Sequence, residues 1–489
     1  MPTLGQKMHI KVIFRVIGIL VMVFSLTLIP PLIVSLIYQD GDTHAFLYAL
    51  LINLLGGFCM WFPFKGNRKE LRIRDGFIIT VLFWSVLGLF GSVPFMLIDS
   101  PNLSFTDALF ESISGLTTTG ATILTGIDDM PHALLFYRQQ LQWLGGMGII
   151  VLAVAIMPML GVGGMQLYRA ETPGPVKDSK LTPRIAETAK ALWYIYASLT
   201  IACALGFWAA GMSLFDAICH SFSTVAIGGF STHDASIGYF DSPMIEAITV
   251  IFMIISALNF GLHFYAWRSR TIMHYFKDSE VKFFGFILLC TITITTLVLA
   301  MTSSYEWSSA FRYAMFESIS IATTTGFGTE DFSTWPNTLP FLLIVTSFAG
   351  GCASSTGGGM KVIRILLILK QGFREIKRLI PPNAIIPVKL GGKAIHERVI
   401  SAVWGFFSAY LLVYVILMIG LMATGLDQLT AWSAVAATLN NLGPGLGEVA
   451  ANFGSISDPA KWMLCFSMLL GRLEVFTLLV LFTPMFWQR

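Results

Sequence analysis

Four short segments of this chain end in glycine and are rich in oxygen atoms that could coordinate a cation. All of them offer backbone carbonyls, and two of them offer three consecutive threonine hydroxyls. Rings of carbonyl oxygens commonly replace the water shell of a dehydrated cation, and none of the four segments contains a basic residue. We therefore predict a cation-binding filter formed by Thr117, Thr118, Thr119 and Gly120; Ala226, Ile227, Gly228 and Gly229; Thr323, Thr324, Thr325 and Gly326; and Asn440, Asn441, Leu442 and Gly443.

These segments belong to an internal repeat. Residues 106–121, 215–230, 312–327 and 429–444 align without gaps, and their aligned glycines are 109, 97 and 117 residues apart. The competing interpretation is that the glycines merely allow close helix packing, which is common in membranes. Fourfold recurrence at a similar spacing favours a shared site.

Each repeated segment lies between two long apolar stretches. The segment itself has about a dozen residues that could be helical, too few for the ~20 that cross a bilayer, so we predict a re-entrant half-membrane helix. The preceding stretches are residues 77–98, 191–210, 283–301 and 399–423, and the following ones are 136–160, 244–267, 339–369 and 462–486.

The resulting fold class is an all-α polytopic membrane protein. Four pseudo-repeats of span, pore helix, filter turn and span surround a central pore, and two N-terminal transmembrane helices, residues 16–38 and 46–64, precede them. This predicts ten spans and four re-entrant segments. The expected boundaries are 1–74 for the leading helices, 75–180, 181–281 and 282–392 for the first three repeats, and 393–489 for the fourth.

Composition agrees with a chain embedded in lipid. Hydrophobic residues make up 55% of its 489 residues and charged residues 12%, about half the share typical of soluble domains. The six cysteines lie in apolar stretches without a CxxC pair. We expect them to be buried, with neither a disulfide framework nor a thiolate metal site.

The basic residues predict the orientation. Of 31 lysines and arginines, 26 lie before the first helix or in residues 65–74, 169–190, 268–282 and 361–398, at alternate ends of successive spans. Basic loops concentrate on the cytoplasmic side, so both termini are expected there. The acidic loops on the opposite side are either a cation-attracting entrance or ordinary solvated loops. Half-helices entering from that side would direct their negative C-terminal ends toward the axis.

Two further stretches carry a family resemblance. With the four turns, residues 142–149 (Gln-Trp-Leu-Gly-Gly-Met-Gly-Ile) and the glycine-rich stretch 350–361 resemble the Trk/Ktr/HKT superfamily of potassium transporters, and especially its bacterial TrkH-type membrane subunits. The resemblance implies potassium as substrate at the filter, uptake across the bacterial inner membrane, and a homodimer. It also implies a cytosolic, nucleotide-binding regulatory subunit of the TrkA type, so that nucleotides act only through that partner and this chain needs no covalent cofactor.

The filter differs from that of simple tetrameric potassium channels. The motif Thr-Val-Gly-Tyr-Gly is absent and the four turns are not identical. A less symmetric ring predicts weaker rejection of sodium.

A gate is predicted beneath the filter. Five glycines and three hydroxyl residues interrupt the second span of repeat three, and such a stretch resists helix formation and is typical of ion sites and moving elements. The alternatives are a harmless kink and, less compatible with the sequence, a phosphate-binding loop. The expected gate comprises Gly350, Gly351, Cys352, Ala353, Ser354, Ser355, Thr356, Gly357, Gly358 and Gly359, together with Arg472.

Arg472 is expected in the middle of the last span, facing the cavity below the filter. A charge at that depth is costly and usually functional. It would slow cations or donate hydrogen bonds to carbonyls of the 350–359 loop; the alternative is a structural ion pair with an unidentified carboxylate. Glu474 is a poor partner because residues two apart face different sides of a helix. Glu111, Glu317 and His220, at matching repeat positions, are expected to brace the filter from behind.

Other functions remain as alternatives. An ion-coupled symporter, driven by protons or sodium, would also suit broken helices, but it would more often carry a carboxylate in its pathway. A neutral-solute channel would not need converging half-helices. The chain has no Ser/His/Asp set, HExxH motif or nucleotide loop, so no enzyme is predicted. The basic segment 361–398 is expected to face the cytosol or a partner rather than nucleic acid.

Overall fold

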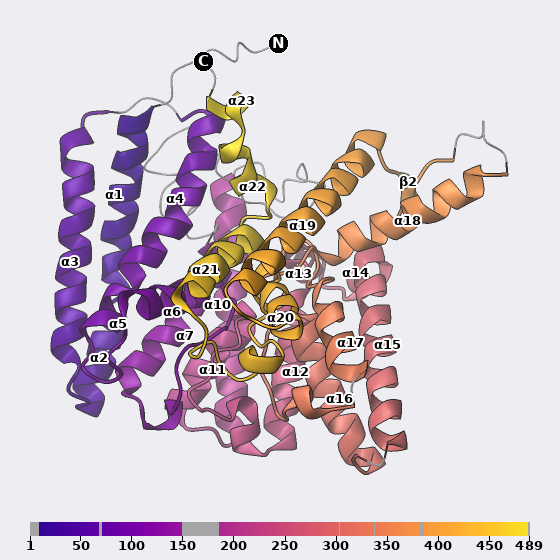
Figure 1. Ribbon diagram of the computed structural model, residues 1–489, viewed down its shortest axis with the longest axis horizontal. Coiled ribbons are helices and arrows are strands. Elements are labelled where there is room, and N and C mark those ends of the chain that lie inside the picture. Colours follow the sequence, from indigo (N-terminus) through magenta and orange to yellow (C-terminus); the bar gives the residue numbers. More distant parts are fainter. Residues whose placement is uncertain are drawn as a thin grey trace.

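The computed structural model describes residues 9–67, 71–148, 185–302, 304–336, 338–380 and 386–487. These residues form helices almost throughout, and their strands are confined to a short antiparallel hairpin, β1 (Lys389–Leu390) with β2 (Lys393–Ala394) (Figure 1). The expected all-α fold is confirmed. Residues 149–160 of the expected span 136–160, and residues 169–184 of the expected basic loop 169–190, lie outside the described residues.

The leading helices form a tight pair at one side of the molecule (Figure 1). α1 (Ile10–Leu26) continues into α2 (Ile29–Tyr38), and α3 (Thr43–Trp61) runs beside them, followed by the short turn η1 (Phe62–Phe64). A methyl group on Gly18 would lie 2.7 Å from the carbonyl oxygen of Gly57. The two backbones therefore touch, the close packing that small residues permit in membranes.

Each of the four expected repeats contains one short helix that leads into its glycine turn, and these short helices are called pore helices below. The first repeat has α4 (Ile73–Gly91), α5 (Val93–Leu97), pore helix α6 (Phe105–Leu116) and α7 (His132–Gly146). The second has α10 (Ile185–Ala209), pore helix α11 (Leu214–Ala226), α12 (Pro243–Ala257), α13 (Phe260–Ser269) and α14 (Met273–Lys277). The third has α15 (Ser279–Met301), pore helix α16 (Trp307–Ala322), α17 (Thr338–Ser347) and α18 (Val362–Arg378). The fourth has α19 (Glu397–Ala423), pore helix α20 (Gln428–Leu439), α21 (Asp458–Arg472), α22 (Phe476–Leu479) and α23 (Pro484–Trp487). Five single turns of 3₁₀ helix lie between them: η2 (Ile127–Asp129), η4 (Ser236–Phe240), η5 (Phe332–Thr334), η6 (Gly447–Val449) and η7 (Val480–Phe482).

Local sequence starts the pore helices. Ser104 accepts a hydrogen bond from the amide of Asp107 over 3.2 Å, and Ser213 accepts one from Asp216 over 3.0 Å. Asp427 caps α20 in the same way. These caps satisfy amides that a helix end leaves free, so they fix where the short helices begin.

The second spans of repeats two and four are broken, as well as that of repeat three. We expected residues 244–267 and 462–486 to be continuous, and that was wrong. α12 and α13 meet at 96°, and α21 meets the α22–η7 segment at 107°. Asn259 caps α13 by accepting from Gly261, while Glu474 and Val475 adopt left-handed backbone with φ of 53° and 52°.

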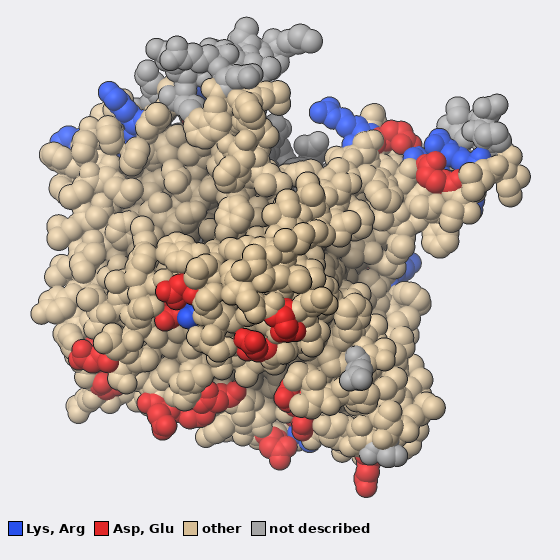
Figure 2. All heavy atoms as spheres, viewed as in Figure 1, with Lys and Arg blue, Asp and Glu red and all other residues tan. Residues whose placement is uncertain are grey.

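Within the described residues, six helices are long and apolar enough to cross a membrane, or up to eight spans if each bent pair counts as one. Most Lys and Arg gather at one end of the molecule and most Asp and Glu lie toward the other, although a few acidic side chains lie among the basic ones (Figure 2). Of the cysteines, Cys59 is exposed and Cys290 is partly exposed, contrary to expectation, and the other four are buried.

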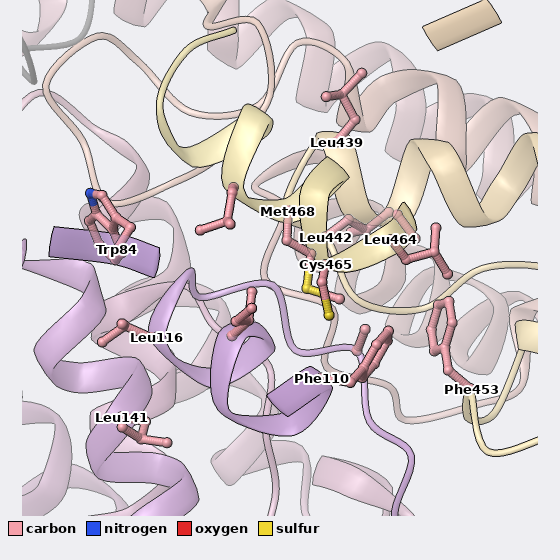
Figure 3. Close-up of a cluster of buried hydrophobic side chains, with 14 of the residues drawn as sticks. Trp84, Phe110, Leu116, Leu141, Leu439, Leu442, Phe453, Leu464, Cys465 and Met468 are labelled. Atoms are coloured by element: carbon pink, nitrogen blue, oxygen red, sulfur yellow. The ribbon is translucent and has the colours of Figure 1, made fainter. Parts of the chain in front are cut away.

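An apolar core joins the first and last repeats. Phe110 of pore helix α6 packs 5.5 Å from the ring of Phe453, and Leu464, Cys465 and Met468 of α21 lie beside them (Figure 3). Residues separated by more than 300 positions thus share one cluster, and this contact brings the first and fourth filter turns together.

Candidate ion pathway

The four pore helices end in the same backbone geometry. In each turn one residue has a left-handed backbone, with φ of 56° at Thr118, 56° at Ile227, 68° at Thr324 and 53° at Asn441. The next amide in each turn donates back to the pore helix, as from Thr119 to Ser114 over 2.9 Å and from Leu442 to Ala437 over 2.7 Å. This is the hydrogen-bond pattern of a helix C-cap, and its fourfold recurrence means that the turns are equivalent in structure as well as in sequence.

The four turns touch one another in a closed ring. A methyl group on Gly120 would lie 2.1 Å from the carbonyl oxygen of Gly228. The same construction places Gly229 at 2.0 Å from the oxygen of Thr325, and Gly326 at 2.1 Å from that of Leu442. Gly443 completes the circuit, at 2.8 Å from the oxygen of Thr119. Each glycine therefore leaves room for a carbonyl of the next turn.

Polar side chains brace this ring. Asn441 donates to the hydroxyl of Thr119 over 2.9 Å, which links the fourth turn to the first. Gln142 of α7 donates to the carbonyl of Gly228 over 2.6 Å and accepts from the amide of Phe230 over 3.0 Å. Thr117 pairs with Thr119, and Thr323 with Thr325, each over 2.7 Å between hydroxyl oxygens. The carbonyls are held in place before any ion arrives.

The carboxylates expected behind the filter bind the chain that follows each turn. Glu111 accepts from the amide of Ile123 over 3.1 Å and from the guanidinium of Arg138 over 2.8 Å. Glu317 accepts from the amide of Thr329 over 2.7 Å, and His220 pairs with the hydroxyl of Ser231 over 2.9 Å. All three side chains are buried, and their hydrogen bonds tie the pore helices to the chain after each turn.

The 350–359 loop lies at the inner ends of the filter turns. Thr356 donates to the carbonyl of Val225 over 3.1 Å, and the amide of Gly358 donates to the hydroxyl of Thr324 over 2.8 Å. The amide of Gly359 donates to the carbonyl of Asn440 over 2.9 Å. The loop thus contacts the third and fourth turns directly, and it contacts the second repeat at Val225, next to the turn.

Arg472 supplies the connection to the first turn. Its guanidinium donates to the hydroxyl of Thr118 over 3.2 Å and to the carbonyl of Thr356 over 3.3 Å, and also to the carbonyl of Gly145. The expected hydrogen bond to a loop carbonyl is present. The expected place in mid-span is wrong, because Arg472 is the last residue of α21 and the helix breaks immediately after it.

Glu474 pairs with Arg364 and not with Arg472. Its carboxylate accepts from Arg364 of α18 over 2.5 Å. Because the helix break turns residue 474 toward α18, this pair joins the end of repeat three to the end of repeat four. Helical periodicity could not reveal it.

Several residues of the pathway escaped sequence analysis. Arg138, 1% exposed, connects Glu111 to the carbonyl of Ser231 and lies 4.2 Å from the ring of Phe230. Buried Lys361 donates to the carbonyl of Gly357. The available signal was a basic residue within an otherwise apolar stretch, the same signal that identified Arg472.

The arrangement is suited to binding a cation. Four helix C-terminal ends, each with partial negative charge, surround a ring of carbonyl oxygens, and carbonyl rings can replace the water of a dehydrated cation. Residues 356–358 and Arg472 lie against the inner side of that ring. Among the described residues, no group of His, Cys, Asp or Glu could hold a resident metal.

Comparison with known proteins agrees with this geometry. A family profile described as "TrkH: Cation transport protein" matches residues 43–489. The chain is 62% identical over 482 residues to "Trk system potassium uptake protein TrkH" of Halomonas elongata, covering 99% of this chain and all of that protein. It is 58% identical to the protein of the same name from Escherichia coli strain K12, covering 98% of this chain and all of that one. A solved structure, "Crystal Structure of the Potassium Transporter TrkH from Vibrio parahaemolyticus", aligns with a TM-score of 0.90 at 57% identity, over 98% of this chain and all of that chain.

Proposed function

The chain belongs to the TrkH family of cation transport proteins, and on this premise we propose that it takes up potassium through a channel-like pore. It is a multi-pass membrane protein. The observation that carries the proposal is the closed ring in which each filter glycine lies against a carbonyl oxygen of the next turn. The relatives at about 60% identity are named as potassium uptake proteins, which supports potassium as the substrate.

We propose that the four turns, residues 117–120, 226–229, 323–326 and 440–443, form the selectivity filter. Potassium is substrate there and not a resident cofactor. The braces from Gln142 and Asn441 hold the carbonyls at fixed separation, and a held ring favours an ion of one size over smaller ones. The unequal turns support weaker rejection of sodium than in a fully symmetric filter.

We propose that the 350–359 loop and Arg472 are the gate. The loop contacts two turns directly, the end of the second pore helix at Val225, and the first turn through Arg472, so an ion leaving the filter would meet it. A positive guanidinium beside Thr118 adds an electrostatic barrier. Conduction then requires the loop and Arg472 to move.

Family membership also supports the wider setting. The relatives belong to a "Trk system", and we propose a homodimer in the bacterial inner membrane with a cytosolic, nucleotide-binding regulatory subunit of the TrkA type. The basic end of the molecule (Figure 2) supports a cytoplasmic location for both termini. The four pseudo-repeats are taken as 75–180, 181–281, 282–392 and 393–489, after leading helices in 1–74.

Rubidium-86 uptake into proteoliposomes containing the purified chain tests the proposal. Potassium should compete most strongly, sodium more weakly and lithium least. A variant lacking residues 354–357 should conduct faster than the intact chain if the loop is a gate. Absence of rubidium uptake in both proteins, or equal competition by all three ions, would contradict the proposed function.

A further inference from the structure

The 350–359 loop leaves and rejoins its helices through a narrow neck. The amide of Val362 donates to the carbonyl of Gly351 over 3.2 Å, and the amide of Met360 donates to that of Phe348 over 3.0 Å. A methyl group on Gly350 would lie 2.1 Å from the carbonyl oxygen of Gly358. The two sides of the neck therefore lie against each other, so the contacts that support the neck determine the position of the loop tip.

One carboxylate oxygen connects the two sides of the neck by hydrogen bonds. Oε1 of Glu280, near the start of α15, accepts from the amide of Ala353 over 2.7 Å and from the amide of Ile363 over 3.1 Å. The first amide lies where the chain enters the loop, and the second lies where the chain leaves it. Glu280 is only 8% exposed, so water has little access to replace its carboxyl oxygen.

The remaining support comes from the break between α12 and α13. The amide of Cys352 donates to the carbonyl of Ala257 over 2.8 Å, and the amide of Phe260 donates to that of Ser354 over 3.1 Å. Both of these hydrogen bonds join backbone groups near the α12–α13 break to backbone groups where the chain enters the loop. Glu280 differs because a side chain makes its hydrogen bonds and because they reach both sides of the neck.

Both supports lead to the same basic segment, residues 268–282. Asp278 accepts from the amides of Glu280 and Val281 over 2.8 and 3.0 Å, and so fixes the start of α15. Tyr275 of α14 pairs with His263 over 2.7 Å, and His263 pairs with the carbonyl of Ile255 at the end of α12 over 2.9 Å. A force on α14 would therefore reach the neck by two routes.

We propose that Glu280 is the positioning residue that holds the 350–359 loop closed. This inference rests on the proposed function and names the residue that keeps the gate shut. The carboxyl oxygen of Glu280 keeps two buried amides paired, so withdrawing it by a movement of the segment 268–282 leaves both without an acceptor, which is costly in a buried site. The neck then separates and the tip leaves the filter.

Two readouts test the proposal, and neither needs the partner. The first is basal rubidium-86 flux in proteoliposomes. The second is maleimide labelling of Cys352, a buried neck residue, in a Cys59→Ser background, because Cys59 is exposed. A Cys352→Ser variant gives the labelling background.

We expect Glu280→Ala to raise basal flux roughly tenfold, as follows from losing two buried hydrogen bonds, and to expose Cys352. Glu280→Asp, whose shorter side chain cannot reach both amides, should act in the same direction. Glu280→Gln keeps an acceptor oxygen and should restore most of the protection. Glu397→Ala is the matched control, because it removes a carboxylate at the start of α19 that pairs with Arg374 and does not touch the neck.

The outcomes separate this proposal from the function on which it rests. Unchanged flux and unchanged Cys352 labelling in both Glu280→Ala and Glu280→Asp overturn the assignment of Glu280, even where deletion of residues 354–357 raises flux. Equal effects from Glu397→Ala and Glu280→Ala also overturn it, because they would show that flux and labelling do not depend on the contacts at the neck. If Glu280→Ala does not accumulate in membranes, Glu280→Asp decides. Failure of the deletion to raise flux is a failure of the gate itself.

Discussion

The side-chain amide of Asn441 donates to the hydroxyl of Thr119 over 2.9 Å, across 322 positions of sequence. The same amide group donates to the carbonyl of Met468 over 3.1 Å. Asn441 thus joins the last filter turn to the first and ties both to α21. It does so at the junction where the glycine contact is loosest, 2.8 Å at Gly443 against 2.0 to 2.1 Å at the other three.

Removing this link should loosen the ring at its weakest junction. We expect Asn441→Ala to reduce discrimination of potassium against sodium by roughly tenfold, since loss of two buried hydrogen bonds is worth about 1–3 kcal/mol and 1.4 kcal/mol is tenfold. Competition of sodium with rubidium-86 uptake measures it. Asn452→Ala is the control, because Asn452 only accepts from the nearby amide of Gly454 on the surface. Unchanged sodium competition in Asn441→Ala would show that the ring does not depend on this contact.

The filter glycines should differ in their tolerance of alanine. At Gly120, Gly229 and Gly326 the added methyl would overlap a carbonyl oxygen at 2.0 to 2.1 Å, and each glycine also has positive φ, between 79° and 81°. Alanine resists that conformation, so we expect potassium flux to fall more than about tenfold.

Gly443 also has positive φ, at 103°, but its clearance to the carbonyl oxygen is larger, at 2.8 Å, so we expect the smallest loss of flux among the four. Gly285→Ala, in a helix with nothing within 4 Å of the added methyl, should conduct normally. Rubidium-86 uptake, normalised to the amount of folded protein, ranks the variants. A Gly443→Ala variant as inactive as Gly326→Ala would contradict the geometric order.

Arg472 should matter through its planar fork as well as its charge. It donates to Thr118, Thr356 and Gly145 at once, and lysine cannot reproduce that geometry. We expect Arg472→Ala to raise basal flux at least tenfold, from hydrogen bonds worth about 1.5–3 kcal/mol each, and Arg472→Lys to give a smaller increase.

Arg378→Ala, at a surface residue of α18 paired with Glu375, is the matched control and should leave basal flux unchanged. Planar-bilayer current from the purified chain measures all three variants. If Arg472→Ala lowers flux while the protein remains folded, Arg472 is part of the conducting path and not of the gate.

Much of the filter could be predicted from the sequence, because a turn that needs positive φ selects glycine and the repeat placed four such glycines in register. The breaks at residues 258–259 and 473–475 could not, because the apolar composition on either side is the same whether the helix continues or bends. The interest of Arg472 followed from the cost of a charge in a membrane, but its place at the end of α21 and its partners depended on that bend. Arg138 was missed because its partner, Glu111, lies 27 positions away and on another helix.

Removing only the Arg138 charge from the buried Arg138–Glu111 ion pair should destabilise the protein more than removing both charges. Both side chains are at most 1% exposed. Arg138→Met leaves the carboxylate buried without its cation, and we expect a loss of about 3–5 kcal/mol in stability, as for other broken buried pairs. Adding Glu111→Gln removes the stranded charge while its amide oxygen still accepts from Ile123.

The double variant should therefore be more stable than Arg138→Met alone, with a coupling of roughly 1–3 kcal/mol. Thermal unfolding of the four proteins in detergent gives the cycle. Additive effects would mean that Arg138 acts through its contacts with Phe230 and Ser231 and not through its charge.

His233 should make the outer loops more stable at low pH. Partial burial lowers the pKa of His233, but the neighbouring carboxylates of Asp216 and Asp128 outweigh burial and raise that pKa above its usual value. Its Nδ1 lies 2.5 Å from Asp128 in the loop after the first turn, and its Nε2 lies 3.4 Å from Asp216 in the second pore helix.

Because the folded pKa of His233 exceeds the unfolded one of about 6.5, its stabilising contribution is complete below pH 6.5 and is lost as pH rises through the folded value. The apparent melting temperature in detergent should fall across that interval. In His233→Gln, which cannot carry the charge but can still stack on Tyr239, this part of the pH dependence should vanish. Identical pH profiles in the two proteins would mean that the bridge between the first and second repeats is held by contacts that do not titrate.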